Sequence, residues 1–127
     1  MPKLILVRGL PGSGKSTIAI QNYPQFAHWE SDMFFIKKNG EYIFDTRLIH
    51  VAHKWCLHKV ETDLKSGKNV IVSNTFIARS DIKPYIELAN KLNIEIEVIT
   101  ARGEYGSIHG VSEDIITKMK IRWQEYP

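Results

Sequence analysis

Apolar and polar positions divide the chain into short, nearly continuous apolar runs separated by longer segments with helical spacing. The apolar runs are rich in β-branched residues, which is typical of buried parallel strands. The predicted strands are Lys3 to Arg8, Phe26 to Glu30, Asn69 to Ser73 and Ile94 to Thr100. Because helical segments separate them, the pattern predicts a parallel sheet with right-handed crossovers and helices on both faces.

Apolar residues that recur every three or four positions predict the helices between these strands. The predicted helices are Lys15 to Asn22, Thr46 to Ser66, and one capped by Ser80 or Asp81 that runs to about Asn93. Ser112 is expected to cap a final helix, and acidic residues in its first turn suit the positive end of the helix dipole. Asn39-Gly40, between aromatic residues in 37–45, indicates a turn or short hairpin.

A glycine-rich segment follows the first predicted strand directly. Residues 9–16, Gly-Leu-Pro-Gly-Ser-Gly-Lys-Ser, match the pattern G-x-x-x-x-G-K-[ST]. Backbone N–H groups must turn inward to cradle phosphate oxygens, and side chains on the glycines would obstruct them. Lys15 can reach the β- and γ-phosphates and Ser16 can ligate Mg²⁺, so the segment predicts binding of Mg·ATP or Mg·GTP. The predicted nucleotide-binding residues are Gly9, Gly12, Ser13, Gly14, Lys15, Ser16, Thr17 and His109.

Strand order and loop together predict an α/β fold: a three-layer sandwich with a parallel sheet of about four strands, as in P-loop NTPases and kinases. With 127 residues, we expect a single domain over 1–127. Hydrophobic residues make up 43% of the chain, but no apolar run approaches the roughly 20 residues of a membrane span. The lone Cys56 reads as a reduced core thiol, which favours a cytoplasmic protein with no membrane contact. A net charge of +3 permits a polyanionic partner without identifying one.

Polar residues at the carboxyl ends of the predicted strands suggest phosphoryl transfer. Asp32 is placed to accept a proton from a substrate hydroxyl and to contribute with Ser16 to the metal site, although a helix-capping role is the alternative. Asn74 stands where many P-loop proteins carry a Mg²⁺-linked aspartate, and either orients active-site groups or forms a turn. Arg102 is either a cation that neutralises the transferring phosphoryl group or a solvated surface arginine.

Three other groups of residues could be functional, and each also has a purely structural interpretation. His50, His53 and His58 share a predicted helix, but no further ligand is spaced to complete a metal site. His109 lies in a glycine-rich loop, where it either contacts the base or holds the loop. Aromatic residues around Lys37 and Lys38 suit stacking on a nucleic-acid end or the packing of a small lid equally well.

The motifs together resemble those of the polynucleotide-kinase-like P-loop kinases. They are Gly9 to Thr17, Ser31-Asp32-Met33-Phe34-Phe35, Ser73-Asn74-Thr75-Phe76 and Ile108-His109-Gly110-Val111-Ser112. The resemblance covers most of the chain and is strongest to short phage and bacterial ATP-binding proteins of that group. It implies that Lys15 and Ser16 bind Mg·ATP and that Asp32 is the general base for an acceptor hydroxyl.

The sequence departs from that family at three places. Phe35 replaces an arginine that binds substrate phosphate, Asn74 replaces an acidic residue, and the arginine-bearing lid helix is reduced to 102–107. The resemblance implies an ATP-dependent kinase acting on the 5′-hydroxyl of single-stranded DNA or RNA, or on a nucleotide-like molecule. The alternative is an ATP-binding switch or recruitment module with weak hydrolysis. A nucleoside monophosphate kinase ranks lower because no long lid insertion is present.

Overall fold

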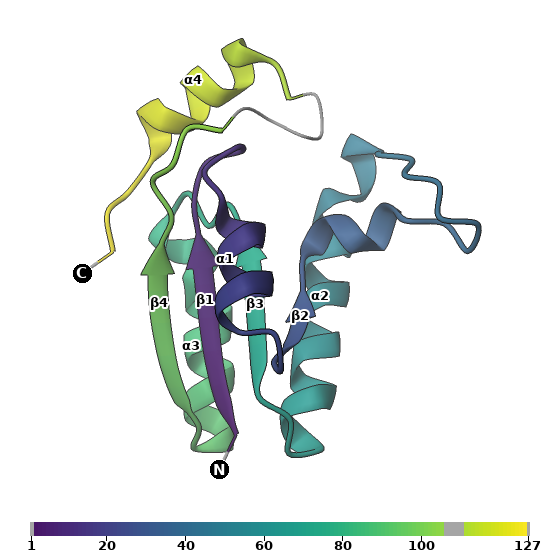
Figure 1. The fold of residues 1–127 in the computed structure, drawn as a ribbon, viewed down its shortest axis with the longest axis vertical. Coiled ribbons are helices and arrows are strands. Elements are labelled where there is room, and N and C mark those ends of the chain that lie inside the picture. Colours follow the sequence, from purple (N-terminus) through teal and green to yellow (C-terminus); the bar gives the residue numbers. More distant parts are fainter. Residues whose placement is uncertain (1, 106–110, 127) are drawn as a thin grey trace.

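The computed structural model describes residues 2–105 and 111–126 and has a four-stranded parallel sheet (Figure 1). The strands are β1 (Lys3–Arg8), β2 (Ala27–Trp29), β3 (Val70–Asn74) and β4 (Glu95–Thr100). Their order across the sheet is β2-β3-β1-β4, and every pairing is parallel. The predicted α/β class and strand number are therefore confirmed.

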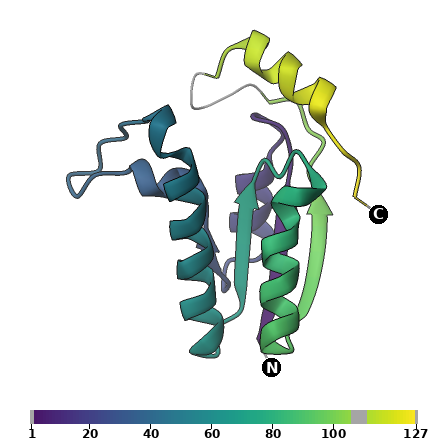
Figure 2. The same cartoon turned by 180° about the vertical axis from the view of Figure 1, so that it is seen from behind.

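Helices cover both faces of the sheet, which makes the three layers that the sequence predicts. α1 (Lys15–Asn22) lies on one face, and α2 (Ile49–Lys65) and α3 (Arg79–Leu92) lie on the other (Figures 1 and 2). Alternate residues of β1 face opposite layers: Leu4 and Leu6 pack in the core with α2 and α3, whereas Ile5 packs with Ala19 of α1. Burial of both faces explains the continuous apolar run in β1.

A fourth helix, α4 (Glu113–Arg122), crosses above the carboxyl ends of the strands (Figure 1). The chain that follows it returns to the sheet edge, where Arg8 binds it. The Arg8 side chain is fully buried and donates to the carbonyl oxygens of Phe76 at 2.6 Å and Gln124 at 2.7 Å. Its guanidinium also lies 4.0 Å from the ring centre of Trp123. Arg8 therefore ties the C-terminal segment to β1 and to the chain after β3.

Several predicted element ends differ from the structure. The α3 helix begins at Arg79 with Ala78 as N-cap, so the prediction that Ser80 or Asp81 caps it is wrong. Asp81 instead lies in the first turn, where its carboxylate accepts the Ala78 N–H at 3.0 Å. The predicted helix from Thr46 is split: a 3-10 turn, η2 (Thr46–Leu48), precedes α2. β2 is one residue shorter at each end than expected.

The excursion over 37–45 contains the short hairpin that the sequence suggests. Ile36 and Tyr42 form an antiparallel bridge, and the Lys37 N–H donates to the Glu41 carbonyl oxygen at 2.7 Å. Gly40 has a φ of 86°, a conformation that glycine adopts without steric cost. Ser112 caps α4 as predicted, accepting the Ile115 N–H. Over the described ranges, no helix has the length and apolar character needed to traverse a bilayer.

Candidate active site

The phosphate-binding loop joins β1 to α1 at the carboxyl edge of the sheet. Gly12 and Gly14 have φ angles of 80° and 89°, so both adopt the left-handed conformation that other residues rarely take. A Cβ on Gly9 would lie 2.9 Å from the carbonyl oxygen of Ala101, closer than a real side chain permits. The glycines predicted from the motif are thus required by backbone conformation and close approach.

The segment after β4 lies directly against this loop. The Gly103 N–H donates to the Ser13 carbonyl oxygen at 3.0 Å, and the Tyr105 N–H donates to the Gly12 carbonyl oxygen at 2.8 Å. We call residues 102–105 the strap. Its bonds occupy carbonyl groups of the phosphate loop and leave the loop's amides, which are the groups that bind anions, uninvolved in these contacts.

Glu30 is the site residue that sequence reasoning missed. It directly follows β2, and its carboxylate Oε2 accepts from the hydroxyls of Ser16 at 2.5 Å and Ser73 at 2.6 Å. His28 Nε2 lies 3.1 Å from the same oxygen. Burial alone would raise the pKa of Glu30, but hydrogen bonds from His28, Ser16 and Ser73 outweigh it and lower the pKa to about 2. Glu30 is therefore ionised at neutral pH beside the phosphate loop.

A signal for Glu30 was available in the strand register. Trp29 pairs with Val72, so the next residue on each strand brings Glu30 level with Ser73 at the sheet edge. In the sequence, Glu30 is predicted only as the last residue of a short strand. The family motif includes Asp32 and not Glu30. The contact with Ser16 depends on how far α1 leans toward β2, which no local pattern reports.

Lys15 is half-buried in the same region. Burial lowers the pKa of Lys15, while the carboxylates of Glu30 and Asp32 act in the opposite direction. Ser16 contacts Glu30 directly, and the roles predicted for Lys15 and Asp32 stay predictions. Thr17 lies on the exposed side of α1, and Ser13 is buried within the loop.

Asp32 lies in the 3-10 helix η1 (Ser31–Phe35), one turn beyond β2. The Tyr42 hydroxyl of the hairpin bonds to the Asp32 carboxylate. Burial raises the pKa of Tyr42, and the negative charge of Asp32 raises it further. Phe35 is only 4% exposed and packs edge-to-face with Phe44, with 5.0 Å between ring centres. The position that carries an arginine in the resembled kinases is therefore part of a small aromatic core.

Asn74 joins the ends of β2 and β3. Its Oδ1 accepts the Ser31 N–H at 2.9 Å, and Ser31 Oγ lies 2.8 Å from His53 Nδ1. The role of Asn74 in orienting active-site groups stays a prediction, because this contact is to the Ser31 backbone. Below it, a cavity of about 270 Å³ opens between α2 and α3. Its polar lining comes from His50, His53, Lys54, Asn74, Ser80 and Asp81.

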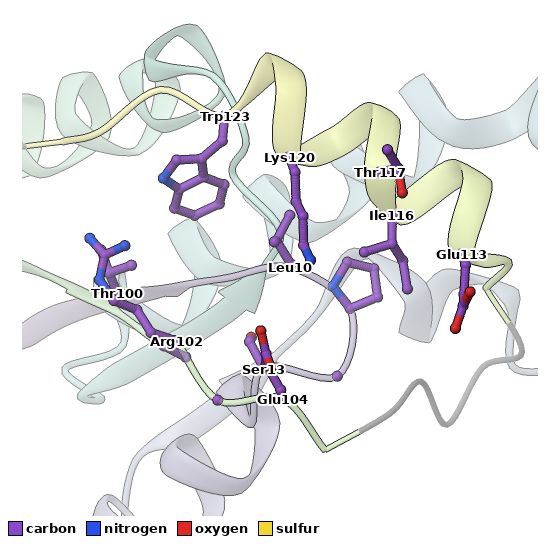
Figure 3. A pocket seen from close by; sticks show the side chains of 14 residues that line it. Leu10, Ser13, Thr100, Arg102, Glu104, Glu113, Ile116, Thr117, Lys120 and Trp123 are labelled. Atoms are coloured by element: carbon purple, nitrogen blue, oxygen red, sulfur yellow. The ribbon is translucent and has the colours of Figure 1, made fainter.

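A larger cavity of about 640 Å³ lies on the other side of the phosphate loop, beneath α4. Figure 3 shows Glu113, Ile116 and Lys120 pointing from α4 toward the loop residues Leu10 and Ser13. The volume falls in the range of small-molecule sites. The carboxylates Glu30 and Asp32 do not line it. The candidate site therefore has a cavity under α4 and, separately, an acidic region at the end of β2.

Arg102 lines the larger cavity, but its guanidinium is paired with Glu125 through two bonds, at 2.7 and 3.2 Å. Both side chains are more than half exposed. Its role at a phosphoryl group stays a prediction that would require release from Glu125. Lys120, which the sequence did not single out, is the second cation of this cavity (Figure 3).

Two remaining sequence predictions concern histidines. His109 lies outside the described residues, so its contact with the base stays a prediction. Among residues 2–105 and 111–126, no three or more His, Cys, Asp or Glu side chains lie close enough together to hold a metal ion. Cys56 is a free, buried thiol.

The fold and the phosphate loop together define a P-loop kinase-like domain. The family described as "AAA domain" (AAA_33) matches residues 4–102, and the chain belongs to this family. Human NEDD4-binding protein 2 is 31% identical over 97% of the chain, which spans 8% of the length of that protein. Protein PM0531 of Pasteurella multocida is 24% identical over the whole chain and 79% of its own length.

Solved structures agree on the fold. The Pnkp1/Rnl/Hen1 complex contains a chain with a TM-score of 0.64 and 22% identity, covering 92% of this chain and 38% of that one. APS kinase CysC of Mycobacterium tuberculosis, bound to AMPPNP and APS, has a TM-score of 0.56 and 18% identity over 79% of this chain and 62% of its own. The predicted resemblance to polynucleotide-kinase-like P-loop kinases is confirmed at the level of family and fold.

Proposed function

We propose that this protein is an ATP-dependent kinase that phosphorylates a hydroxyl group, most plausibly the 5′-hydroxyl of a polynucleotide or of a nucleotide-like molecule. The observation that carries the proposal is that the phosphate loop with Lys15, the Ser16–Glu30 contact and Asp32 in η1 all lie at the carboxyl edge of the sheet. A lysine for the phosphates and a carboxylate for an acceptor hydroxyl are the two groups that phosphoryl transfer requires. Two backbone hydrogen bonds connect the strap to the phosphate loop.

Asp32 is the proposed general base. Its place on a short 3-10 turn, with Tyr42 bonded to its carboxylate, restricts the side chain that would accept the acceptor's proton. As the oxygen of the acceptor attacks the γ-phosphorus, its O–H bond breaks and the proton passes to Asp32. The bond between the γ-phosphorus and the leaving ADP oxygen breaks in the same step.

The donor atoms around Ser16 fit Mg²⁺. Ser16 Oγ and the neighbouring carboxylates are hard oxygen ligands, the type that this ion prefers. When bound, Mg²⁺ would offset negative charge on the nucleotide phosphates. Ser16 and Asp32 remain the ligands proposed from the sequence.

Acceptor chemistry is argued from the smaller cavity beside Asn74. His50 and Lys54 of α2 supply basic side chains there, and Asp81 of α3 supplies a carboxylate. Because Phe35 is buried, these basic groups are the nearest substitutes for an arginine that would bind a substrate phosphate. The similarity in fold to a chain of the Pnkp1/Rnl/Hen1 RNA repair complex supports a polynucleotide end as the acceptor.

Transfer of labelled γ-phosphate from ATP tests the proposal, with 5′-hydroxyl DNA, 5′-hydroxyl RNA, nucleosides and water as separate acceptors. We expect labelled oligonucleotide and a loss of about 10² to 10⁴ in rate for Asp32→Asn, the range of general-base catalysis. Asp45→Asn is the matched control, because Asp45 is a carboxylate at the end of the adjoining excursion and pairs with Arg47 on the surface. Free phosphate as the only product, unchanged in Asp32→Asn, would contradict the proposal and favour the nucleotide switch.

A further inference from the structure

We infer that Glu30, at the end of β2, supplies the negative charge of the Mg²⁺ site in place of an acid at the end of β3. In P-loop NTPases the metal is held by the loop's Ser or Thr together with an aspartate. The residue at the end of β3 is here the neutral Asn74. This inference rests on the proposed nucleotide-dependent function. It assigns the carboxylate charge of the Mg²⁺ site to a residue outside the recognised motifs.

Asn74 is committed to a structural contact. Its side-chain oxygen accepts the Ser31 N–H at 2.9 Å, and the side chain is 9% exposed. An amide oxygen held by a backbone donor still has a lone pair, but it carries no charge to offset a divalent cation. The position expected to hold the metal-linked acid therefore connects two strands.

Glu30 makes the contact that the aspartate would otherwise make. Its carboxylate accepts the Ser16 hydroxyl proton at 2.5 Å. A hydroxyl has one proton and two lone pairs, so Ser16 can donate to Glu30 while a lone pair faces a cation on the phosphate side. The carboxylate and the hydroxyl then form a paired set of hard oxygen donors.

The surrounding groups hold Glu30 in the charged form and in place. Ser73, the neighbour of Asn74 on β3, donates to the same carboxylate oxygen at 2.6 Å, and the Glu30 side chain is 15% exposed. The titratable groups that face Glu30 are His28 from β2 and Lys15 from α1, with Asp32 near Lys15. A carboxylate has about four lone-pair sites, so these contacts leave acceptor capacity for a metal or its bound water.

Metal affinity measured without any acceptor tests this assignment. The protein is loaded with AMPPNP, a non-transferring ATP analogue, and Mn²⁺ as a paramagnetic substitute for Mg²⁺ is titrated while electron paramagnetic resonance reports free Mn²⁺. We expect Glu30→Gln to weaken Mn²⁺ binding at least 10-fold. Calorimetry in EDTA should show metal-free AMPPNP binding unchanged or a few-fold tighter, because a negative charge has been removed near the phosphates.

Two controls separate charge from packing. Ser73→Ala removes one donor to Glu30 but no charge, and should change Mn²⁺ affinity less than 3-fold. Glu30→Asp keeps the charge but withdraws it from Ser16, and should give a loss between those of the other two variants. Thermal unfolding of each variant shows whether it folds. If Glu30→Gln does not fold, the Mn²⁺ affinity of Glu30→Asp is the test.

Unchanged Mn²⁺ affinity in Glu30→Gln and Glu30→Asp would overturn the inference. A loss in Asp32→Asn but not in Glu30→Gln would overturn it too and return the metal charge to Asp32. Because no phosphate acceptor is present, a negative kinase assay leaves the result intact. Failure of the unsubstituted protein to bind AMPPNP would instead refute the nucleotide-binding function.

Discussion

At the scale of single residues, Glu30 shows how a buried carboxylate can be kept charged. Three polar side chains, His28, Ser16 and Ser73, converge on it from β2, α1 and β3. Their hydrogen bonds compensate for lost hydration, which would otherwise favour the protonated acid. The same bonds make the charge of Glu30 part of the folding energy, because an unfolded chain lacks them.

Stability should therefore fall in acid partly through Glu30. Its pKa is about 2 in the folded protein and near 4.5 in the unfolded chain, so the stabilisation is present above about pH 4.5 and is lost as pH falls toward 2. Linkage gives a loss of about 2 kcal/mol between pH 5 and pH 3 from this group. Urea unfolding at both pH values should show that loss in the unsubstituted protein and a correspondingly smaller one in Glu30→Gln. Equal losses in the two proteins would contradict the assignment.

At the scale of elements, the carboxyl edge is held by contacts between segments distant in the sequence. Arg8 at the end of β1 binds the chain after β3 and the chain after α4, and the strap binds the phosphate loop. These contacts position α4 above the larger cavity. The geometry of the candidate site consequently depends on residues outside the phosphate loop.

Replacement of Arg8 by Met should be strongly destabilising. The substitution removes a buried charge and leaves the carbonyl oxygens of Phe76 and Gln124 without the Arg8 donor, whereas the Ile77 carbonyl oxygen still accepts the Gln124 N–H. Each unsatisfied buried group costs about 1 to 3 kcal/mol, so we expect a total of about 3 kcal/mol or more. Lysine at this position should restore little, because it lacks the planar fork of donors. Urea unfolding measures the effect, and Arg47→Ala on the exposed surface should stay within about 0.5 kcal/mol of the unsubstituted protein.

The strap should matter for nucleotide affinity because it is hydrogen-bonded to the phosphate loop. A Cβ on Gly103 would lie 2.8 Å from the Ser13 carbonyl oxygen, so Gly103→Ala must push the strap away from the loop. Losing one backbone hydrogen bond of about 1 kcal/mol corresponds to roughly 5-fold weaker ATP binding by calorimetry.

Gly40→Ala is the control for the strap variant. A Cβ on Gly40 meets no atom within 4 Å, although its φ of 86° makes alanine unfavourable by about 1 kcal/mol. We expect lower stability with unchanged ATP affinity in Gly40→Ala. A strap variant that binds ATP as well as this control would show that the strap does not support the loop.

At the scale of the whole molecule, ligand binding and folding are coupled. A nucleotide that binds only the folded state adds about 2.7 kcal/mol of stability when present at 100 times its Kd. For a chain of 127 residues this corresponds to a rise in Tm on the order of 10 °C. Mg·ATP should produce such a rise in scanning calorimetry.

Lys15→Ala should largely remove that rise. Loss of a charge-assisted contact to phosphate costs about 1.5 to 3 kcal/mol, which is roughly 10- to 100-fold in affinity. Lys68→Ala, which loses only a surface ion pair with Asp63, should retain the full rise. Equal stabilisation of Lys15→Ala and Lys68→Ala by ATP would show that the loop is not the nucleotide site.

Periodicity and turn chemistry together predicted most of the fold. Strands buried on both faces, such as β1 and β3, read as continuous apolar runs, and the glycine-lysine motif can work only between a strand and a helix. The helix ends were less predictable. Asp81 is the third residue of α3, and its carboxylate accepts the N–H of Ala78, which precedes the helix. An N-cap aspartate would instead accept an N–H from the residues that follow it. The sequence alone could not distinguish these two positions for Asp81.

Within the candidate site, the sequence by itself determined the groups whose role is local. Lys15, Ser16 and the loop glycines take their positions from the backbone of one short segment, and Asp32 follows its strand by three residues. Only the tertiary structure decided that Glu30 contacts Ser16, that Asn74 connects two strands, that Phe35 is buried and that Arg102 pairs with Glu125. Those contacts join residues 14 to 43 positions apart or depend on packing between layers, and no pattern along a single segment encodes such distances.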